Sequence, residues 1–182
     1  MAFKYKNKEI REKRNAAKYI FISVFALILF LISASVIPFI AQNGRIPSGD
    51  LLLCLIGAFC AYATLKEGMV FALIFGLLAD LFLYPPTSFS PIVYVAAVIV
   101  TGLLLKRFAR VSSIIVAVCT LPAILIRCSV ETVNALTNSD GLSLWDILGA
   151  YTLPMVVINF ACAIVICFIF RRFMRVLGIR QQ

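Results

Sequence analysis

Three ionisable residues lie inside otherwise apolar stretches of this chain, and they are the side chains most able to do chemistry. Asp80 stands near the end of the apolar run Met69–Tyr84, and Arg127 and Glu131 lie four residues apart in the run Val111–Leu136. Residues four apart share one face of an α-helix, so Arg127 and Glu131 are predicted to be neighbours. An ionisable group in hydrocarbon normally has a partner or a task.

The depths of these residues predict an ion pair. At about 1.5 Å per residue, Arg127 lies roughly 24 Å along its helix from Val111, and Asp80 lies roughly 17 Å from Met69. We therefore predict that Asp80 and Arg127 pair across a helix bundle, directly or through water, with Glu131 at the outer mouth. The alternative is separate satisfaction by hydroxyl or backbone groups, or extension of Arg127 and Glu131 to the membrane interface.

The inventory of reactive groups argues against catalysis. The chain has no histidine, no Gly-x-Ser-x-Gly motif and no glycine-rich phosphate loop. The acids within the apolar runs stand one on each of two segments, so a carboxylate cluster for a metal ion is not expected. None of the cysteines forms a Cys-x-x-Cys pair, and we interpret all six as small apolar residues. The sequence predicts a non-enzymatic protein without a cofactor or metal.

Composition predicts an integral membrane protein. Hydrophobic residues make up 63% of the 182 positions and the mean hydropathy is +1.04, which is too apolar for a soluble domain of this size. A spanning helix needs about 20 apolar residues. Six apolar segments predict an all-α polytopic fold of six transmembrane helices, at residues Tyr19–Ile40, Leu51–Leu65, Met69–Tyr84, Pro91–Leu105, Val111–Leu136 and Ile147–Phe170.

Two details complete this prediction. Lys66, Glu67 and Gly68 are interpreted as the tight connection between the second and third spans, because a Lys-Glu pair at the middle of one long span is unfavourable. The basic leader and the apolar run that follows resemble a signal peptide, but the run continues to Ile40, which favours a retained first helix.

The charge distribution predicts the orientation. Fifteen of the seventeen basic residues lie before the first span, in the second and fourth connections, or in the C-terminal tail. Arg45 lies in the first connection and Arg127 within a span. This is the positive-inside pattern, with both termini in the cytoplasm. The basic tails, residues 1–18 and 171–182, are expected to contact anionic lipids, and nucleic acid is not expected as a partner.

Small residues recur at helical spacing on two segments. Gly68, Ala72 and Gly76 precede Asp80 at intervals of four, and a second pair of small residues is Gly57 and Ala61. Small residues let another helix approach closely in a membrane. The smooth face therefore either packs inside the bundle, which is the commoner use, or docks a partner helix.

Other local signals mark helix ends and distortions. Ser48 or Asp50 is predicted to cap the second helix. Pro122 and Pro154 fall inside the last two spans, where each is expected to kink its helix. Trp145 lies where an interfacial aromatic anchor is expected.

The chain resembles the MreD family of rod-shape-determining membrane proteins. Ile46-Pro47-Ser48-Gly49-Asp50-Leu51-Leu52-Leu53 resembles the family's proline-then-leucine entry to the second helix. Lys66-Glu67-Gly68 and Phe75-Gly76-Leu77-Leu78-Ala79-Asp80-Leu81-Phe82 resemble its glycine-punctuated helix ending in a Gly-Leu-Leu-x-Asp segment. Length, six spans and basic tails agree over essentially the whole chain. The chain departs from the family at Tyr84-Pro85-Pro86-Thr87, where glycines are usual, so a partner contact there would differ.

The resemblance implies a non-enzymatic scaffold in the bacterial plasma membrane. MreD-like proteins act in cell elongation with the bitopic protein MreC, the actin-like filament MreB, and the glycosyltransferase and transpeptidase that build lateral peptidoglycan. Their compact bundle is similar to the six-helix substrate-binding subunits of energy-coupling-factor vitamin transporters. A vitamin-binding subunit is therefore the alternative function. It requires polar groups in an outer pocket, and the short outer connections with a single Trp, Trp145, favour the scaffold.

Overall fold

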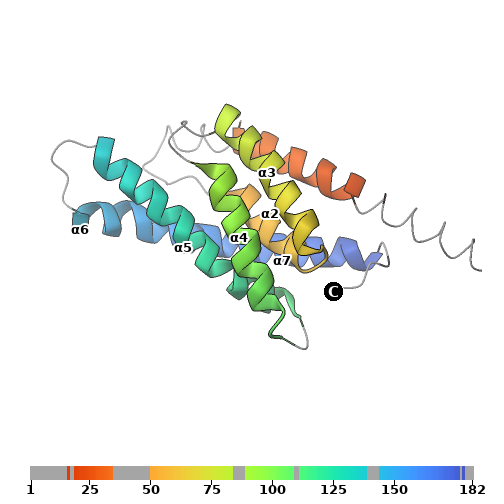
Figure 1. The fold of residues 1–182 in the computed structure, drawn as a ribbon. Helices are drawn as coiled ribbons and strands as arrows, with labels where there is room; N and C mark the ends of the chain where they lie inside the picture. The colour runs from red at the N-terminus through yellow and green to blue at the C-terminus, as the bar shows by residue number, and fades with distance from the viewer. Residues whose placement is uncertain are drawn as a thin grey trace, which may run out of the picture.

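The computed structural model describes residues 19–34, 50–83, 89–108, 111–138 and 144–176, together with residues 16 and 178. Within these ranges the secondary structure is entirely helical, with short turns (Figure 1). After the first helix, Tyr19–Ala34, follow α2 (Leu51–Cys60), α3 (Leu65–Phe82), α4 (Ser90–Leu105), α5 (Ser113–Asn138), α6 (Leu144–Ile147), the π-helical turn η2 (Leu148–Thr152) and α7 (Leu153–Val176).

Helix α2 is the centre of the bundle. Every residue from Leu52 to Phe59 is buried, as expected for a helix that is apolar all round. It packs against α3, α4, α5 and α7. Because it has ten residues, it is about 15 Å long. Its N-terminal end therefore lies within the bundle rather than beyond it.

The start of α3 corrects the predicted connection. Thr64 Oγ1 accepts a hydrogen bond from Glu67 N, and the Glu67 carboxylate accepts one from Thr64 N. This capping box starts the helix at Leu65. Lys66, Glu67 and Gly68 therefore form the first turn of α3, and the connection after α2 is the short turn that ends at Thr64. The Thr-x-x-Glu signal was present in the sequence.

The last helix is longer than predicted and contains a widened turn. It begins at Leu144 and reaches Val176, so Arg171, Arg172 and Arg175 belong to a helix rather than to a tail. The π-helical turn η2 ends two residues before Pro154. A proline ring inside a helix clashes with the carbonyl four residues back, and a wider turn accommodates it. Helix α5 continues through Pro122 as an α-helix.

Several predicted features lie outside the described residues. These are most of the N-terminal tail, the end of the first span at 35–40, the outer connection with Arg45 and Ser48, residues 84–88, Arg110, residues 139–143 and Arg180.

The small-residue face of α3 packs against α4. Gly68, Ala72 and Gly76 are all buried. A Cβ atom added to Gly76 would lie 2.5 Å from Pro91 Cα, and one added to Gly68 would lie 2.9 Å from Val98 Cγ1. The described structure therefore uses this face inside the chain, as the internal-packing interpretation expects.

The same device joins α2 to α5. A Cβ atom added to Gly57 would overlap the side chain of Thr120 on α5. The second small residue of this pair, Ala61, is buried at the C-terminal end of α2.

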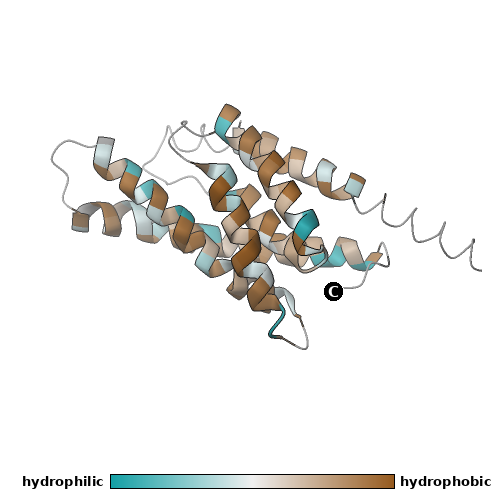
Figure 2. Ribbon diagram, in the orientation of Figure 1, coloured by the Kyte–Doolittle hydropathy of each residue, from teal (hydrophilic) through white to brown (hydrophobic). Residues whose placement is uncertain are grey.

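The outer faces of the surrounding helices are apolar (Figure 2). Two helices, Ser113–Thr137 and Leu148–Val176, are long and apolar enough to cross a membrane. Within Leu148–Val176, 33% of an apolar stretch of 18 residues is buried inside the bundle. The core helix of a soluble protein is mostly buried, so the exposed apolar surface of Leu148–Val176 is expected to contact another apolar surface.

We predict that replacing Gly76 by Ala weakens the bundle. The new methyl group meets the backbone of Pro91, which cannot move aside as a side chain could, and overpacking of this kind costs about 1–3 kcal/mol. Gly149→Ala is the matched control, because its added Cβ has no atom within 4 Å. The midpoint of thermal unfolding in mild detergent should fall for Gly76→Ala and stay within error for Gly149→Ala. Equal midpoints would contradict the close α3–α4 contact.

Candidate functional site: a buried polar cluster around Arg127

Arg127 on α5 is the largest fully buried side chain among the described residues, with 0% of its surface exposed. Its Nε lies 3.3 Å from Asp50 Oδ2, and its Nη2 lies 2.8 Å from Glu131 Oε1. Its Nη1 donates a hydrogen bond to Ser90 Oγ at 3.3 Å. The contacts at Nε and Nη2 are held by charge more than by well-aligned hydrogen bonds. One guanidinium thereby connects α5 with the starts of α2 and α4.

Asp50 is the main acceptor of the cluster, and it is 1% exposed. Its carboxylate caps α2 by accepting a hydrogen bond from Leu53 N at 3.0 Å, as predicted for this position. The hydroxyl of Tyr94 on α4 lies 2.8 and 2.9 Å from the two carboxylate oxygens. The backbone N of Asp50 donates to Asn159 Oδ1 on α7 at 2.6 Å. Four helices therefore meet at this residue.

Asn159 has further contacts with sulfur atoms. Its backbone carbonyl accepts from the Cys54 thiol at 3.3 Å, and its Nδ2 lies 3.9 Å from Cys128 Sγ. Asn159 itself is fully buried. These cysteines are buried and reduced, and they pack as small residues beside the polar groups.

Asp80 holds a different place from the one predicted. Its Oδ1 accepts a hydrogen bond from Ser90 N at 3.1 Å. Ser90 is the first residue of α4, whose first N–H groups have no partner within the helix. A carboxylate there is also favoured by the helix dipole. Asp80 thus caps α4 from the end of α3.

The predicted pair of Asp80 and Arg127 therefore needs correction. The carboxylates that the structure places against the guanidinium are those of Asp50 and Glu131. Asp80 is linked to Arg127 through Ser90, which donates its N–H to one and accepts from the other. The physical reason is the position of α4, which packs against both α3 and α5.

Glu131 extends the cluster toward the last helix. It lies on the same face of α5 as Arg127, as predicted, and is 14% exposed. The Tyr151 hydroxyl donates to Glu131 Oε2 at 3.2 Å. At the next residue of each segment, the hydroxyls of Thr132 and Thr152 lie 2.6 Å apart. Tyr151 and Thr152 both belong to η2, so the widened turn before Pro154 brings two polar side chains to α5.

The composition of the cluster is typical of a set of polar groups that hold helices together. One cation faces two carboxylates, and further hydrogen bonds to these three ions come from the hydroxyl groups of Tyr94, Ser90 and Tyr151 and from Leu53 N. The described residues contain no group of three His, Cys, Asp or Glu side chains placed to hold a metal ion. A buried ion pair stabilises a fold only when hydrogen bonds satisfy the remaining polar atoms, and this arrangement supplies several of them.

Sequence reasoning found part of this cluster. It identified Arg127, Glu131 and Asp80, but it treated Asp50 only as a helix cap and did not consider Tyr94 or Asn159. A usable signal existed for α4, because Ser90 and Tyr94 lie four residues apart and share a face.

Comparison of the chain with protein family models, with curated proteins and with solved structures finds no match. The described residues define the class of the protein as an all-helical bundle with a central buried helix and an internal ionic cluster.

We predict that Asp50 and Arg127 are strongly coupled. Removing one partner of a buried ion pair leaves the other charge uncompensated and costs about 3–5 kcal/mol of unfolding free energy. Asp50→Asn and Arg127→Gln should each have a loss of this size, and the double variant should lose clearly less than their sum. The measurement is a double-mutant cycle of denaturant unfolding in mild detergent.

The same cycle with Asp80→Asn and Arg127→Gln is the matched comparison. Because Ser90 separates these two residues, their coupling should be smaller than that of Asp50 with Arg127. A larger coupling for Asp80 would restore the pairing predicted from the sequence.

We also predict a specific contribution from the Tyr94 hydroxyl. Tyr94→Phe keeps the ring but removes a donor to a charged acceptor, which costs about 1.5–3 kcal/mol. Tyr151→Phe removes the more exposed bond to Glu131 and should cost less. Unfolding free energies of the two variants provide the test, and an equal or reversed order would contradict the central place of Asp50.

Proposed function

We propose that this protein is an integral membrane protein with six transmembrane helices and both termini in the cytoplasm. Its described surface and interior are distributed as in a lipid-embedded bundle. Large apolar side chains are exposed along α3, α5 and α7, whereas Arg127 and Asp50 are buried. Charged groups in hydrocarbon face the bundle interior and pair with each other.

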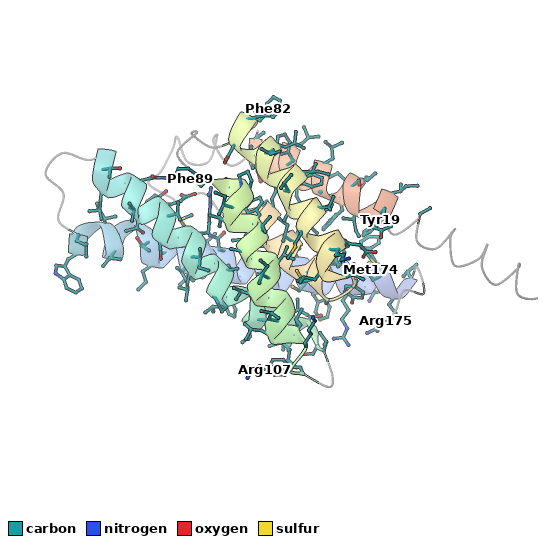
Figure 3. The ribbon with its side chains drawn as sticks, in the orientation of Figure 1. Tyr19, Phe82, Phe89, Arg107, Met174 and Arg175 are labelled. Carbon is teal, nitrogen blue, oxygen red and sulfur yellow. The ribbon has the colours of Figure 1, made fainter. Side chains whose placement is uncertain are left out.

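The placement of basic residues supports the proposed orientation. Arg107 and Arg175 lie toward the same side of the molecule as Tyr19, whereas Phe82 and Phe89 lie at the opposite side (Figure 3). The positive-inside rule assigns the basic side to the cytoplasm. The short α2 then spans only part of the membrane, and its cap Asp50 lies within the membrane depth, where Arg127 is also expected.

We propose that the protein is a non-enzymatic scaffold subunit of the bacterial cell-elongation machinery, as its resemblance to MreD implies. The observation that carries this proposal is the closure of the polar cluster. Asp50, Tyr94, Arg127 and Glu131 are bonded to one another and are buried or nearly so. Polar groups that bond to one another stabilise a rigid bundle, whereas a transporter site leaves polar groups directed at a ligand.

One hollow in the described structure lies away from the outer side, where a vitamin-binding subunit needs its pocket. It lies where the C-terminal end of α2 and the end of α4 meet, at the basic side, and its lining is mostly apolar. The vitamin hypothesis requires a polar pocket at the outer side. We therefore propose that the bundle is similar to the substrate-binding subunits of energy-coupling-factor transporters in architecture only.

The packing of α3 limits where a partner helix binds. Because Gly68 and Gly76 contact α4, an MreC-like helix has to use another face of the bundle. The exposed side chains of Val70, Leu73 and Leu77 lie on the outward face of α3 and offer such a surface. Contacts with MreB and the peptidoglycan synthases would then be indirect, through this partner.

We predict that depletion of the protein rounds rod-shaped cells and disperses lateral wall synthesis. A plasmid copy should restore the rod shape, Gly149→Ala should do so equally, and Arg127→Gln should fail because the bundle loses its brace. Cell shape and incorporation of a fluorescent cell-wall precursor are the measurements.

Affinity purification in mild detergent should also recover an MreC-like bitopic protein with the wild type. Rescue of the depleted cells by an added vitamin would instead support the transporter function.

A further inference from the structure

A partly open hollow of about 340 Å³ lies at the basic side of the bundle, away from the polar cluster. It is bounded by the turn between α2 and α3, the C-terminal half of α4 and the residues before α5. Most of its lining is apolar and includes Ala61, Leu65, Val98, Leu105 and Val111.

Small residues keep this space open. Gly102 lines the hollow without a side chain, and a Cβ added there would lie 3.2 Å from Leu65 Cδ1. Ala61 and Ala63 contribute only methyl groups to the lining. The hollow is therefore a space between helices into which a slender apolar group can enter.

One cationic side chain lines the hollow. Lys106 is the one charged side chain among the described residues that line it, and it is exposed. Lys66 and Arg107 are the immediate neighbours in sequence of lining residues Leu65 and Lys106. The acid nearest in sequence, Glu67, accepts hydrogen bonds from Thr64 N and the Tyr19 hydroxyl.

We propose that this hollow binds one acyl chain of an anionic phospholipid of the inner leaflet, with the lipid phosphate against Lys106. An apolar cavity with a cation at its mouth is complementary to a molecule with an apolar tail and an anionic head. Basic pockets between transmembrane helices on the cytoplasmic side bind such headgroups. The proposal rests on the proposed membrane location of the chain, but not on its role in cell elongation.

Native mass spectrometry of the purified protein in a non-ionic detergent tests the site. The probes are phosphatidylglycerol and phosphatidylcholine with identical acyl chains. We expect one tightly retained phosphatidylglycerol and weaker retention of phosphatidylcholine. Lys106→Gln should weaken phosphatidylglycerol binding about fivefold, the effect of one cation near an anionic lipid. Arg107→Gln, at the next position but outside the lining, should change it less than twofold.

A second variant tests the apolar part. Gly102→Leu fills the hollow and should reduce retention of both lipids. Inorganic phosphate should bind measurably to neither the wild-type protein nor this variant. Equal retention of the two lipids, or equal effects of Lys106→Gln and Arg107→Gln, would overturn the proposal. Saturable binding of inorganic phosphate in place of lipid would also overturn it. Lys106→Gln leaves the polar cluster intact. Whether this variant restores the rod shape of depleted cells therefore tests the proposed function separately from lipid binding.

Discussion

The architecture depends on the burial of one guanidinium. Arg127 is wholly enclosed, and a cation in an apolar interior requires opposite charge within a few ångströms. Asp50 and Glu131 supply it, the first from the cap of α2 and the second from the next turn of α5. Ser90 and Tyr94 bring α4 to the same point, and the bond from Asp50 to Asn159 brings α7. The positions of four helices are therefore set by contacts that converge on one ion pair.

Around this cluster the helices are held together by close packing rather than by charged groups. Gly76 on α3 lets the backbone of α4 approach at Pro91. Gly68 on α3 leaves room for the Val98 side chain of α4, and Gly57 on α2 leaves room for the Thr120 side chain of α5. These close contacts lie beneath an exterior of Leu, Ile, Val and Phe side chains. Close packing and internal polar bonds hold helices together when the surrounding medium is as apolar as the side chains themselves.

Composition and periodicity predicted the all-helical bundle, because long apolar segments have few other solutions. They also predicted the shared face of Arg127 and Glu131. The partner of Arg127 could not be assigned in this way, because depth along two helices does not reveal that α4 lies between them. Asp50 was correctly predicted as a cap of the second helix, but its place in the ion pair was not predicted, for a related reason. The second helix was expected to run from Leu51 to Leu65, whereas it ends at Cys60, and the cap of so short a helix lies inside the bundle.

The most direct measurement of the central claim is an experimental structure of the protein in a lipid nanodisc, at a resolution that shows side chains. The account predicts that the Arg127 guanidinium faces the bundle interior within 4 Å of the Asp50 carboxylate, as it does here at 3.3 Å. An Arg127 side chain directed at acyl chains or headgroups, with Asp50 on a separate surface of the molecule, would contradict it.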